Sequence, residues 1–205
     1  MRLSAFAMDV WRERLLSGAL IFLVNVVFDL LTVTLLLRFY LQWARAPYRN
    51  PLSEFLHALT DFMVRPARRV IRGYWGLDLA TLALAWLAQF LNLFFELQLR
   101  GYQVGAQAGL AFVGLIAMAA VMVLKMGLYI VMVAVIVQAV LTWIGPYSPV
   151  MPLLNSMTRP FLRVFQRFVP PIGNVDLSSL FVLVVCQLLL MVPVAYLEVT
   201  AARLF

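Results

Sequence analysis

The sequence predicts an all-α polytopic membrane protein made of two tandem repeats, each consisting of a helix, an amphipathic segment and a second helix. Composition is the first observation: 64% of the 205 residues are hydrophobic, 12% are charged, and the mean hydropathy is +0.96. A water-soluble globule of this size could not bury so much apolar surface. The second observation is a set of long apolar runs, and the third is that the two halves of the chain resemble each other.

Four apolar runs predict four core transmembrane helices, because roughly 20 apolar residues in a helix cross about 30 Å of hydrocarbon. The runs are 15–43, 77–99, 126–144 and 177–199. We expect residues 1–100 to form the first repeat and residues 101–205 the second. The first run is about twice as long as the apolar region of a signal peptide, so we expect it to be retained as a helix.

A further apolar stretch at 104–125 leaves the number of crossings open. It could be a fifth membrane helix, a re-entrant hairpin or an extension along the outer surface. Gly105 and Gly109 have the spacing of small residues that lets another helix approach closely. A fifth crossing would make the two copies inverted repeats, as in many transporters, but the distribution of arginines argues against it.

The repeat is visible in polar residues and prolines that match at a fixed offset. Trp43 and Trp143 match at an offset of 100, and the other pairs match at 98. Those pairs are Pro51 with Pro149, Thr60 with Thr158, Arg65 with Arg163, Arg69 with Arg167, Asp78 with Asp176, and Gln89 with Gln187. Shared hydrophobicity cannot explain matches of this kind, so they indicate two copies of one unit.

These motifs resemble the YggT family, also called YlmG, of bacterial and plastid membrane proteins. Copy one has Arg38 and Trp43, then "NP", "TD", "RPARRVI" and "GLDLA"; copy two has Trp143, then "SP", "TRPFLR" and "NVDLSS". Copy two departs from the family pattern at Gln138, where an arginine is expected, and at Arg159, where an aspartate is expected. The resemblance covers nearly the whole chain. It implies roles in osmotic stress tolerance, cell division or membrane-complex assembly.

The connectors between the helices of each copy, 44–76 and 145–176, determine the predicted orientation. The first contains six arginines and two acidic residues, and the second has three arginines and no acid over 145–175. By the positive-inside rule both connectors should face the cytoplasm. We therefore predict a multi-pass inner-membrane protein with cytoplasmic connectors and both termini outside.

Both connectors have the periodicity of amphipathic helices, with leucines and phenylalanines on one face and charged residues on the other. Pro66 and Pro160 should break or kink these helices. We interpret them as interfacial helices whose arginines contact anionic lipid or a partner. A solvated loop that only sets orientation, and a specific docking or anion site, are the alternatives. The arginines concerned are Arg65, Arg68, Arg69, Arg72, Arg159, Arg163 and Arg167.

Asp78 and Asp176 precede the second helix of each copy, where an aspartate can cap the helix and interact with its positive end. The alternative is an ion pair with the connector, of Asp78 with Arg65 or Arg69 and of Asp176 with Arg163 or Arg167.

The remaining repeat-motif residues are assigned structural roles. We expect Thr60 and Thr158 to be local caps or turn formers, because no base is placed to activate either hydroxyl. Tryptophans near the helix ends are typical of membrane-interface anchors. The other members of this structural set are Trp43, Pro51, Trp143 and Pro149.

Asp29 is predicted to lie deep in the membrane, because the 14 residues that separate it from Trp43 span about 21 Å of helix. A lone charge there costs several kcal/mol, so it needs a partner or a proton. The polar candidates at similar depth are Asn25, Gln89, Asn92 and Gln187. Interhelical hydrogen bonding is the favoured role and an ion or proton pathway the alternative. Arg38 is expected to extend to the lipid headgroups.

The sequence has no phosphate-binding glycine loop, no clustered metal ligands and no nucleophile with a base, so we predict a non-enzymatic protein without cofactor or metal. One cysteine, Cys186, and one histidine, His57, cannot form a zinc site within one chain. The net charge of +7 favours anionic membrane lipids over nucleic acid. The predicted function is to scaffold or support membrane machinery, through other membrane proteins or self-association. A small ion or osmolyte transporter is the alternative.

Overall fold

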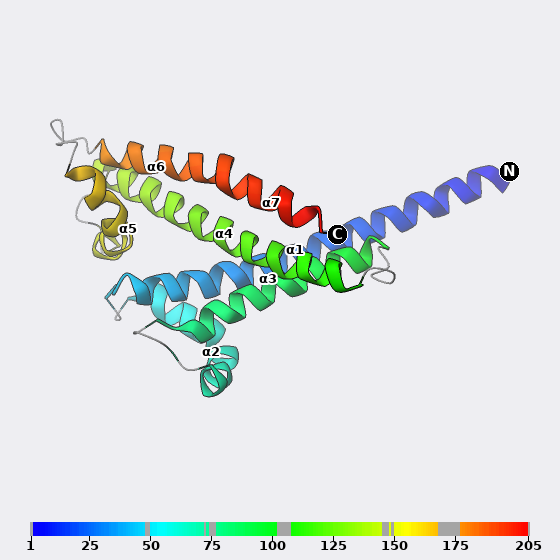
Figure 1. Cartoon of the computed structure of the whole chain (residues 1–205), viewed down its shortest axis with the longest axis horizontal. Coiled ribbons are helices and arrows are strands. Elements are labelled where there is room, and N and C mark those ends of the chain that lie inside the picture. Colours follow the sequence, from blue (N-terminus) through cyan, green and yellow to red (C-terminus); the bar gives the residue numbers. More distant parts are fainter. Residues whose placement is uncertain are drawn as a thin grey trace.

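The structure is a computed structural model, and its regular elements are helices (Figure 1). It describes residues 2–47, 50–71, 73, 77–101, 108–144, 148, 150–167 and 177–204. The elements are α1 (Arg2–Trp43), α2 (Pro51–Val70), α3 (Leu79–Leu99), α4 (Ala108–Ile144), α5 (Met151–Gln166), α6 (Ser178–Leu189), the π-helical turn η1 (Leu190–Val194) and α7 (Ala195–Ala202). The predicted all-α class is confirmed.

Four helical segments in the described residues are long and apolar enough to cross a membrane, which confirms a multi-pass membrane protein. They are Leu15–Trp43, Leu79–Leu99, Ala111–Thr142 and Ser178–Ala202. The last segment is one continuous helix in which η1 joins α6 to α7. Pro193 lies inside η1, where a π turn accommodates a residue that cannot donate the usual helical hydrogen bond.

The stretch at 104–125 is resolved by α4, which runs without interruption from Ala108 to Ile144. From Ala108 onward the stretch is therefore the first half of α4, and the predicted 126–144 helix is the second half. It is not a separate fifth helix or a re-entrant hairpin. Gly105 lies outside the described residues, and a Cβ added at Gly109 would meet open space. The close approach occurs at Gly114 instead, where a Cβ would lie 3.0 Å from Leu204 Cβ.

Local signals in the sequence explain where the helices of copy one begin and end. Asn50 caps α2 by accepting a hydrogen bond from the Ser53 N–H at 2.8 Å, and Pro51 occupies the first helical turn, where no N–H donor is needed. The chain leaves α1 through a turn in which Arg45 has a φ of 50° and the Ala46 N–H donates to the Leu41 carbonyl at 3.0 Å. This turn directs the chain from α1 towards α2.

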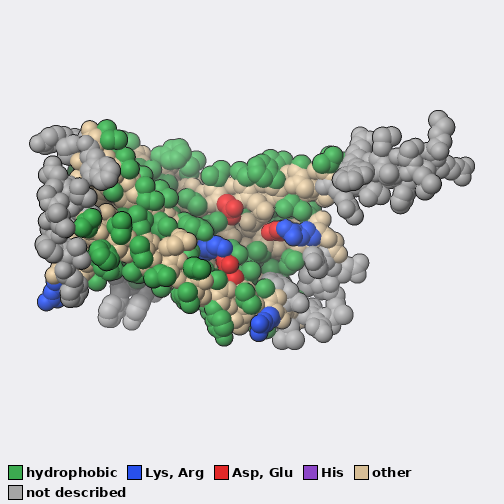
Figure 2. All heavy atoms as spheres, turned by 90° about the horizontal axis from the view of Figure 1, so that it is seen from above, with side chains coloured by type: hydrophobic (Ala, Val, Ile, Leu, Met, Phe, Trp, Pro, Cys, Tyr) green, Lys and Arg blue, Asp and Glu red, His purple; other side chains and the backbone are tan. Residues whose placement is uncertain are grey.

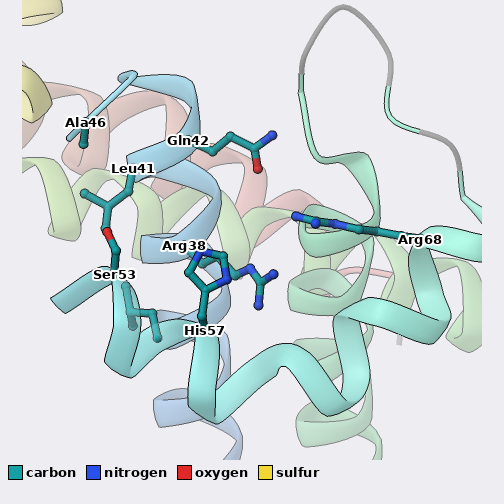
Figure 3. A pocket seen from close by; sticks show the side chains of 8 residues that line it. Arg38, Leu41, Gln42, Ala46, Ser53, His57 and Arg68 are labelled. Atoms are coloured by element: carbon teal, nitrogen blue, oxygen red, sulfur yellow. The ribbon is translucent and has the colours of Figure 1, made fainter. Parts of the chain in front are cut away.

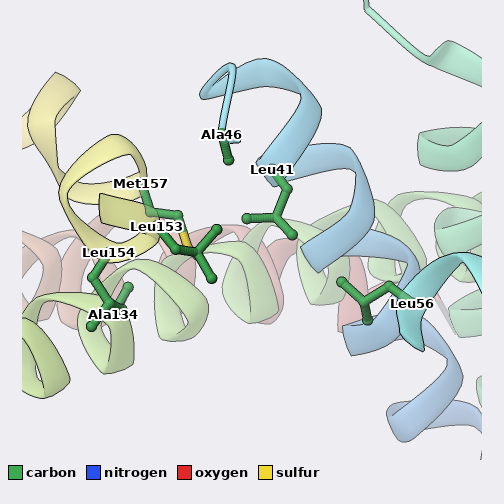
Figure 4. Close-up of a cluster of buried hydrophobic side chains, with 7 residues drawn as sticks. All are labelled: Leu41, Ala46, Leu56, Ala134, Leu153, Leu154 and Met157. Atoms are coloured by element: carbon green, nitrogen blue, oxygen red, sulfur yellow. The ribbon is translucent and has the colours of Figure 1, made fainter. Parts of the chain in front are cut away.

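The connector helices α2 and α5 lie at the same end of the bundle and share a hydrophobic cluster with residues of α1, of the turn that follows α1, and of α4. The cluster consists of Leu41, Ala46, Leu56, Ala134, Leu153, Leu154 and Met157 (Figure 4). Because the cluster contains residues of both connector helices, the two connectors cannot lie at opposite ends of the molecule. The predicted even number of crossings between them agrees with this arrangement.

Neither connector helix ends at its internal proline. Pro66 lies within α2 and Pro160 within α5, so of the predicted break or kink, the break is absent. Both prolines are exposed on the surfaces of their helices.

Candidate functional site

The connector end of copy one is built around Arg38 of α1, whose side chain extends to α2. Its Nη1 donates to Thr60 Oγ1 at 2.6 Å and to Asp61 Oδ1 at 2.8 Å, and the side chain is only 4% exposed. The prediction that Arg38 extends to the headgroups is therefore wrong. A carboxylate and a hydroxyl from α2 give this guanidinium charge-assisted hydrogen bonds inside the protein.

Asp61 is the centre of this ion-pair network. It accepts from Arg65 Nε at 3.1 Å and from Arg65 Nη2 at 2.7 Å, and His57 Nδ1 lies 3.5 Å away. Burial acts to raise the pKa of Asp61, but the hydrogen bonds and charges of Arg38 and Arg65 outweigh it and lower the pKa to about 2. Arg65 is therefore engaged within the protein.

Thr60 and Thr158 lie in the interiors of α2 and α5, not in the caps or turns we predicted. Each hydroxyl lies within hydrogen-bond distance of the carbonyl four residues earlier, at 2.6 Å and 2.8 Å respectively. That bond satisfies a buried threonine inside a helix. The same hydroxyls contact the first helix of their own copy, Thr60 through Arg38 and Thr158 through Gln138. Both threonines thus join a connector to a membrane helix.

Asp78 is the N-cap of α3, as predicted, and accepts from the Thr81 N–H at 3.4 Å. It pairs with Arg68, whose Nε and Nη2 donate at 3.1 Å and 2.5 Å, and not with Arg65 or Arg69. Arg65 is engaged with Asp61 one turn earlier, whereas Arg69 is exposed. Burial acts to raise the pKa of Asp78, but hydrogen bonds from Arg68 and Thr81 lower it.

Four of the predicted contact arginines are exposed and have no ion pair among the described residues. They are Arg69, Arg159, Arg163 and Arg167. Their contact with lipid or a partner stays a prediction. Arg72, Pro149 and Asp176, and the side chain of Trp143, lie outside the described residues.

The two connector helices bury their apolar residues differently. In α2, Phe55, Leu59 and Phe62 are 58%, 45% and 72% exposed, and their spacing places them on one side of the helix. In α5, Leu153, Leu154, Met157 and Leu162 are buried. Only α2 therefore presents a large apolar face outward, as an interfacial helix does.

Tyr40 connects the first helix of copy one to the connector of copy two. Its hydroxyl donates to the Met157 carbonyl of α5, and its ring stacks on Trp43 with centroids 5.7 Å apart. Phe161 of α5 lies 6.1 Å from the Trp43 ring. Sequence reasoning missed Tyr40, because its repeat counterpart is Val140 and no motif marks the position.

Within the membrane helices, Asp29 of α1 is held by amides of α3. Asp29 Oδ1 accepts from Gln89 Nε2 at 2.9 Å and from Asn92 Nδ2 at 3.3 Å. This is the interhelical hydrogen bonding that we favoured. Asn25 Oδ1 is buried with no hydrogen-bond partner among the described residues. Gln187 is exposed on α6 and makes no contact with this network.

Copy two has an ion pair between its membrane helices, at a position that does not correspond to the Asp29 network of copy one. Lys125 Nζ of α4 lies 2.6 Å from Glu198 Oε1 of α7. Lys125 lies in the middle of α4 and not at a helix end. Hydrophobic side chains cover most of the surface in Figure 2, and a few acidic and basic side chains lie close together on it. The pair joins the two membrane helices of its copy.

Comparison with known proteins agrees with the repeat. The model of the CCB3/YggT family matches residues 17–99 and 117–197. Each match contains a membrane helix, a connector and a second membrane helix. No solved structure matches the chain.

The relatives are bacterial proteins of similar length. An uncharacterized protein of Pseudomonas aeruginosa is 34% identical over 176 residues, which cover 85% of this chain and 87% of that protein. The uncharacterized protein YggT of Escherichia coli K12 is 29% identical over 190 residues, which cover 91% of this chain and 95% of YggT. With both copies matched by the family model, this chain belongs to the CCB3/YggT family.

Proposed function

We propose that this protein is a non-enzymatic inner-membrane scaffold that supports other membrane machinery through a surface formed by both connectors. We call this surface the connector platform; it comprises α2, α5 and the exposed Arg69, Arg159, Arg163 and Arg167. One observation carries the proposal: α2 and α5 come from different copies but share one hydrophobic cluster (Figure 4).

The shared cluster gives the platform a fixed geometry. Burying a leucine contributes about 1.5–3 kcal/mol, and the cluster contains four leucines from α1, α2 and α5. Two independent loops could move separately, whereas two helices anchored to one core keep their exposed side chains at constant spacing. A constant spacing of charges is what recognition of a particular partner requires.

The charge of the platform suggests the chemistry of its contacts. Its four exposed arginines have no counter-charge among the described residues, so they can attract anionic headgroups or an acidic protein surface. The positive-inside rule supports a cytoplasmic position for the platform. Osmotic stress tolerance, cell division and membrane-complex assembly, which the family resemblance implies, are the processes in which to seek the supported machinery.

Site-specific photo-crosslinking in cells tests the scaffold directly. A photoreactive amino acid in place of Val164, which is 57% exposed on α5, should capture a discrete partner or a second copy of this chain. Changing Arg69, Arg159, Arg163 and Arg167 together to Gln should reduce capture several-fold. The control changes Arg100 and Arg203 to Gln. These two arginines follow the C-terminal ends of α3 and α7, away from the connector platform. Capture that survives the platform variant, or that both variants weaken equally, contradicts the proposal.

The contacts of Asp29 favour the scaffold over the transporter alternative. Its Oδ1 already accepts two interhelical hydrogen bonds, which gives the carboxylate a structural role. Purified protein in liposomes should therefore show no ion flux that Asp29→Asn abolishes. A flux that disappears in this variant would support transport.

A further inference from the structure

A cavity of about 180 Å³ lies between α1 and α2 at the connector end. Arg38, Ser53, His57 and Arg68 are among the side chains that line it. Figure 3 shows the Arg38 and Arg68 side chains extending toward each other from the two helices. One water molecule occupies about 30 Å³ in the liquid, so the cavity has room for a group of several heavy atoms.

Arg38 provides the strongest sign of a ligand. Both of its hydrogen bonds to α2 are made through Nη1, and its Nε is buried with no hydrogen-bond partner among the described residues. Leaving a buried donor of a charged group unpaired destabilises the folded protein. An acceptor inside the cavity would remove that cost.

Arg68 has donors left for the same cavity. A guanidinium has five N–H groups, and Asp78 engages Arg68 only at Nε and Nη2. Nη1 of Arg68 donates no hydrogen bond to the part of the chain that the structure describes. Two guanidiniums with unused donors therefore face one space, in the arrangement that binds the oxygens of a phosphate.

The local charge balance favours a monoanion. Arg38, Arg65 and Arg68 supply three positive charges to this network, and Asp61 and Asp78 supply two negative charges. One positive charge is therefore not neutralised. We propose that the cavity between Arg38 and Arg68 binds a singly charged phosphate group.

Two sources of such a group fit this position. The exposed Phe55, Leu59 and Phe62 of α2 place the cavity near lipid headgroups, whose phosphodiester carries one negative charge. Inorganic phosphate from solution has the same oxygens. The site goes beyond the scaffold function and does not depend on it, since a ligand can bind whether or not the platform captures a partner.

The test measures the thermal stability of the purified full-length protein in detergent. The probes are inorganic phosphate and dihexanoyl phosphatidylglycerol, each compared with sodium chloride at equal ionic strength. At least one probe should raise the Tm of the wild type. Arg68→Gln should raise the half-saturating concentration about tenfold, as expected for the loss of charged hydrogen bonds.

Two further variants keep the test decisive. Arg68→Lys preserves a cation beside Asp78 but lacks the two-pronged donor, so it should fold and still respond less to the probe. Arg45→Gln removes an exposed cation that does not line the cavity, so its response should equal that of the wild type.

The outcomes separate the sources and can overturn the site. A response to phosphatidylglycerol alone identifies a headgroup, and a response to inorganic phosphate identifies a soluble ligand. If neither probe stabilises the wild type beyond chloride, the cavity is not a phosphate site. Equal weakening in Arg45→Gln, or full binding by Arg68→Lys, would also refute it.

Discussion

At the residue scale, the two copies keep one contact but change its charge. Arg38 and Gln138 reach the same turn of their connectors, where each meets a threonine. Copy one completes the site with Asp61, whereas copy two has Arg159 at that position. Gln138 Nε2 donates to Asn155 Oδ1 at 2.7 Å instead. Copy two therefore retains the geometry without the ion pair and leaves a cation exposed.

The effects of substitutions at Arg38 and Asp61 should not be additive, because the two residues form one buried pair. Leaving one partner of a buried pair alone costs about 3–5 kcal/mol, and we expect about 2–3 because Asp61 is 25% exposed. We therefore predict that the effects of Arg38→Gln and Asp61→Asn add to more than the effect of the double variant. Chemical unfolding in detergent measures all three. Strict additivity would mean that the two residues are not coupled.

The same pair predicts an acid dependence. The pKa of Asp61 falls from 3.8 to about 2 in the folded protein, so the ionised carboxylate stabilises the fold above pH about 4. That contribution should fall as the pH drops from about 4 towards 2. The Tm difference between wild type and Asp61→Asn should shrink over this range. A difference that stays constant down to pH about 2 would show that the pKa is not lowered.

Gln89 and Gln187 provide a matched pair for the membrane network. Gln89 bonds Asp29 at 2.9 Å, whereas its repeat counterpart Gln187 is exposed on α6. Gln89→Leu should lower the unfolding free energy by about 1 kcal/mol, as interhelical hydrogen bonds in membranes do. Gln187→Leu should leave it unchanged or raise it. Equal losses in the two variants would argue against a special role for the Asp29 network.

Residue partners were predictable only where depth in the membrane defined them. The depth of Asp29 limited its partners to a few polar residues, and Gln89 and Asn92 were among them. The position of the Arg38 side chain was predicted wrongly because nothing in the sequence shows that α2 packs against α1. The partner of Asp78 was misassigned because the connector path between α2 and α3 decides which arginine meets it.

At the element scale, similar hydrophobic patterns gave two different connector helices. The periodicity predicted both helices correctly. It could not show that α5 buries its apolar face against α1 and α4 while α2 leaves Phe55 and Phe62 exposed. The distinction depends on packing between the copies. It makes α2 the helix that should contact lipid.

Spin labels on α2 test this assignment. With Cys186 replaced by Ser, a label at Phe62→Cys should collide more with oxygen, which concentrates in lipid, than with a water-soluble nickel complex. A label at Glu54→Cys, on the exposed charged side of α2, should show the reverse. Similar accessibility at both positions would mean that α2 is surrounded by water.

The membrane helices were predictable as four apolar runs, but the extent of the third was left open. Hydropathy located three of the four spans to within three residues at each end, whereas the third begins at Ala111 and not at the predicted residue 126. The stretch at 104–125 was ambiguous because α4 has 37 residues, about 55 Å of helix, and so exceeds the hydrocarbon thickness. No proline or capping residue marks a boundary within it. Only the continuous hydrogen bonding of the helix shows that it is one element.

At the scale of the whole molecule, each copy is held together by a polar contact between its membrane helices. Copy one uses Asp29 with Gln89 and Asn92, and copy two uses Lys125 with Glu198. The copies meet through α3 and α4 and at the connector end, where the shared cluster and Tyr40 join them. The duplication thus produces one connector surface from two sequence segments.

Cysteine labelling from the two sides of the membrane tests this arrangement most directly. In a Cys186→Ser background, Arg69→Cys and Arg163→Cys should both react with a membrane-impermeant maleimide in inverted vesicles and not in intact spheroplasts. Arg203→Cys, at the other end of the bundle, should show the opposite pattern. If Arg69→Cys and Arg163→Cys react from opposite sides, the connectors cannot form one platform.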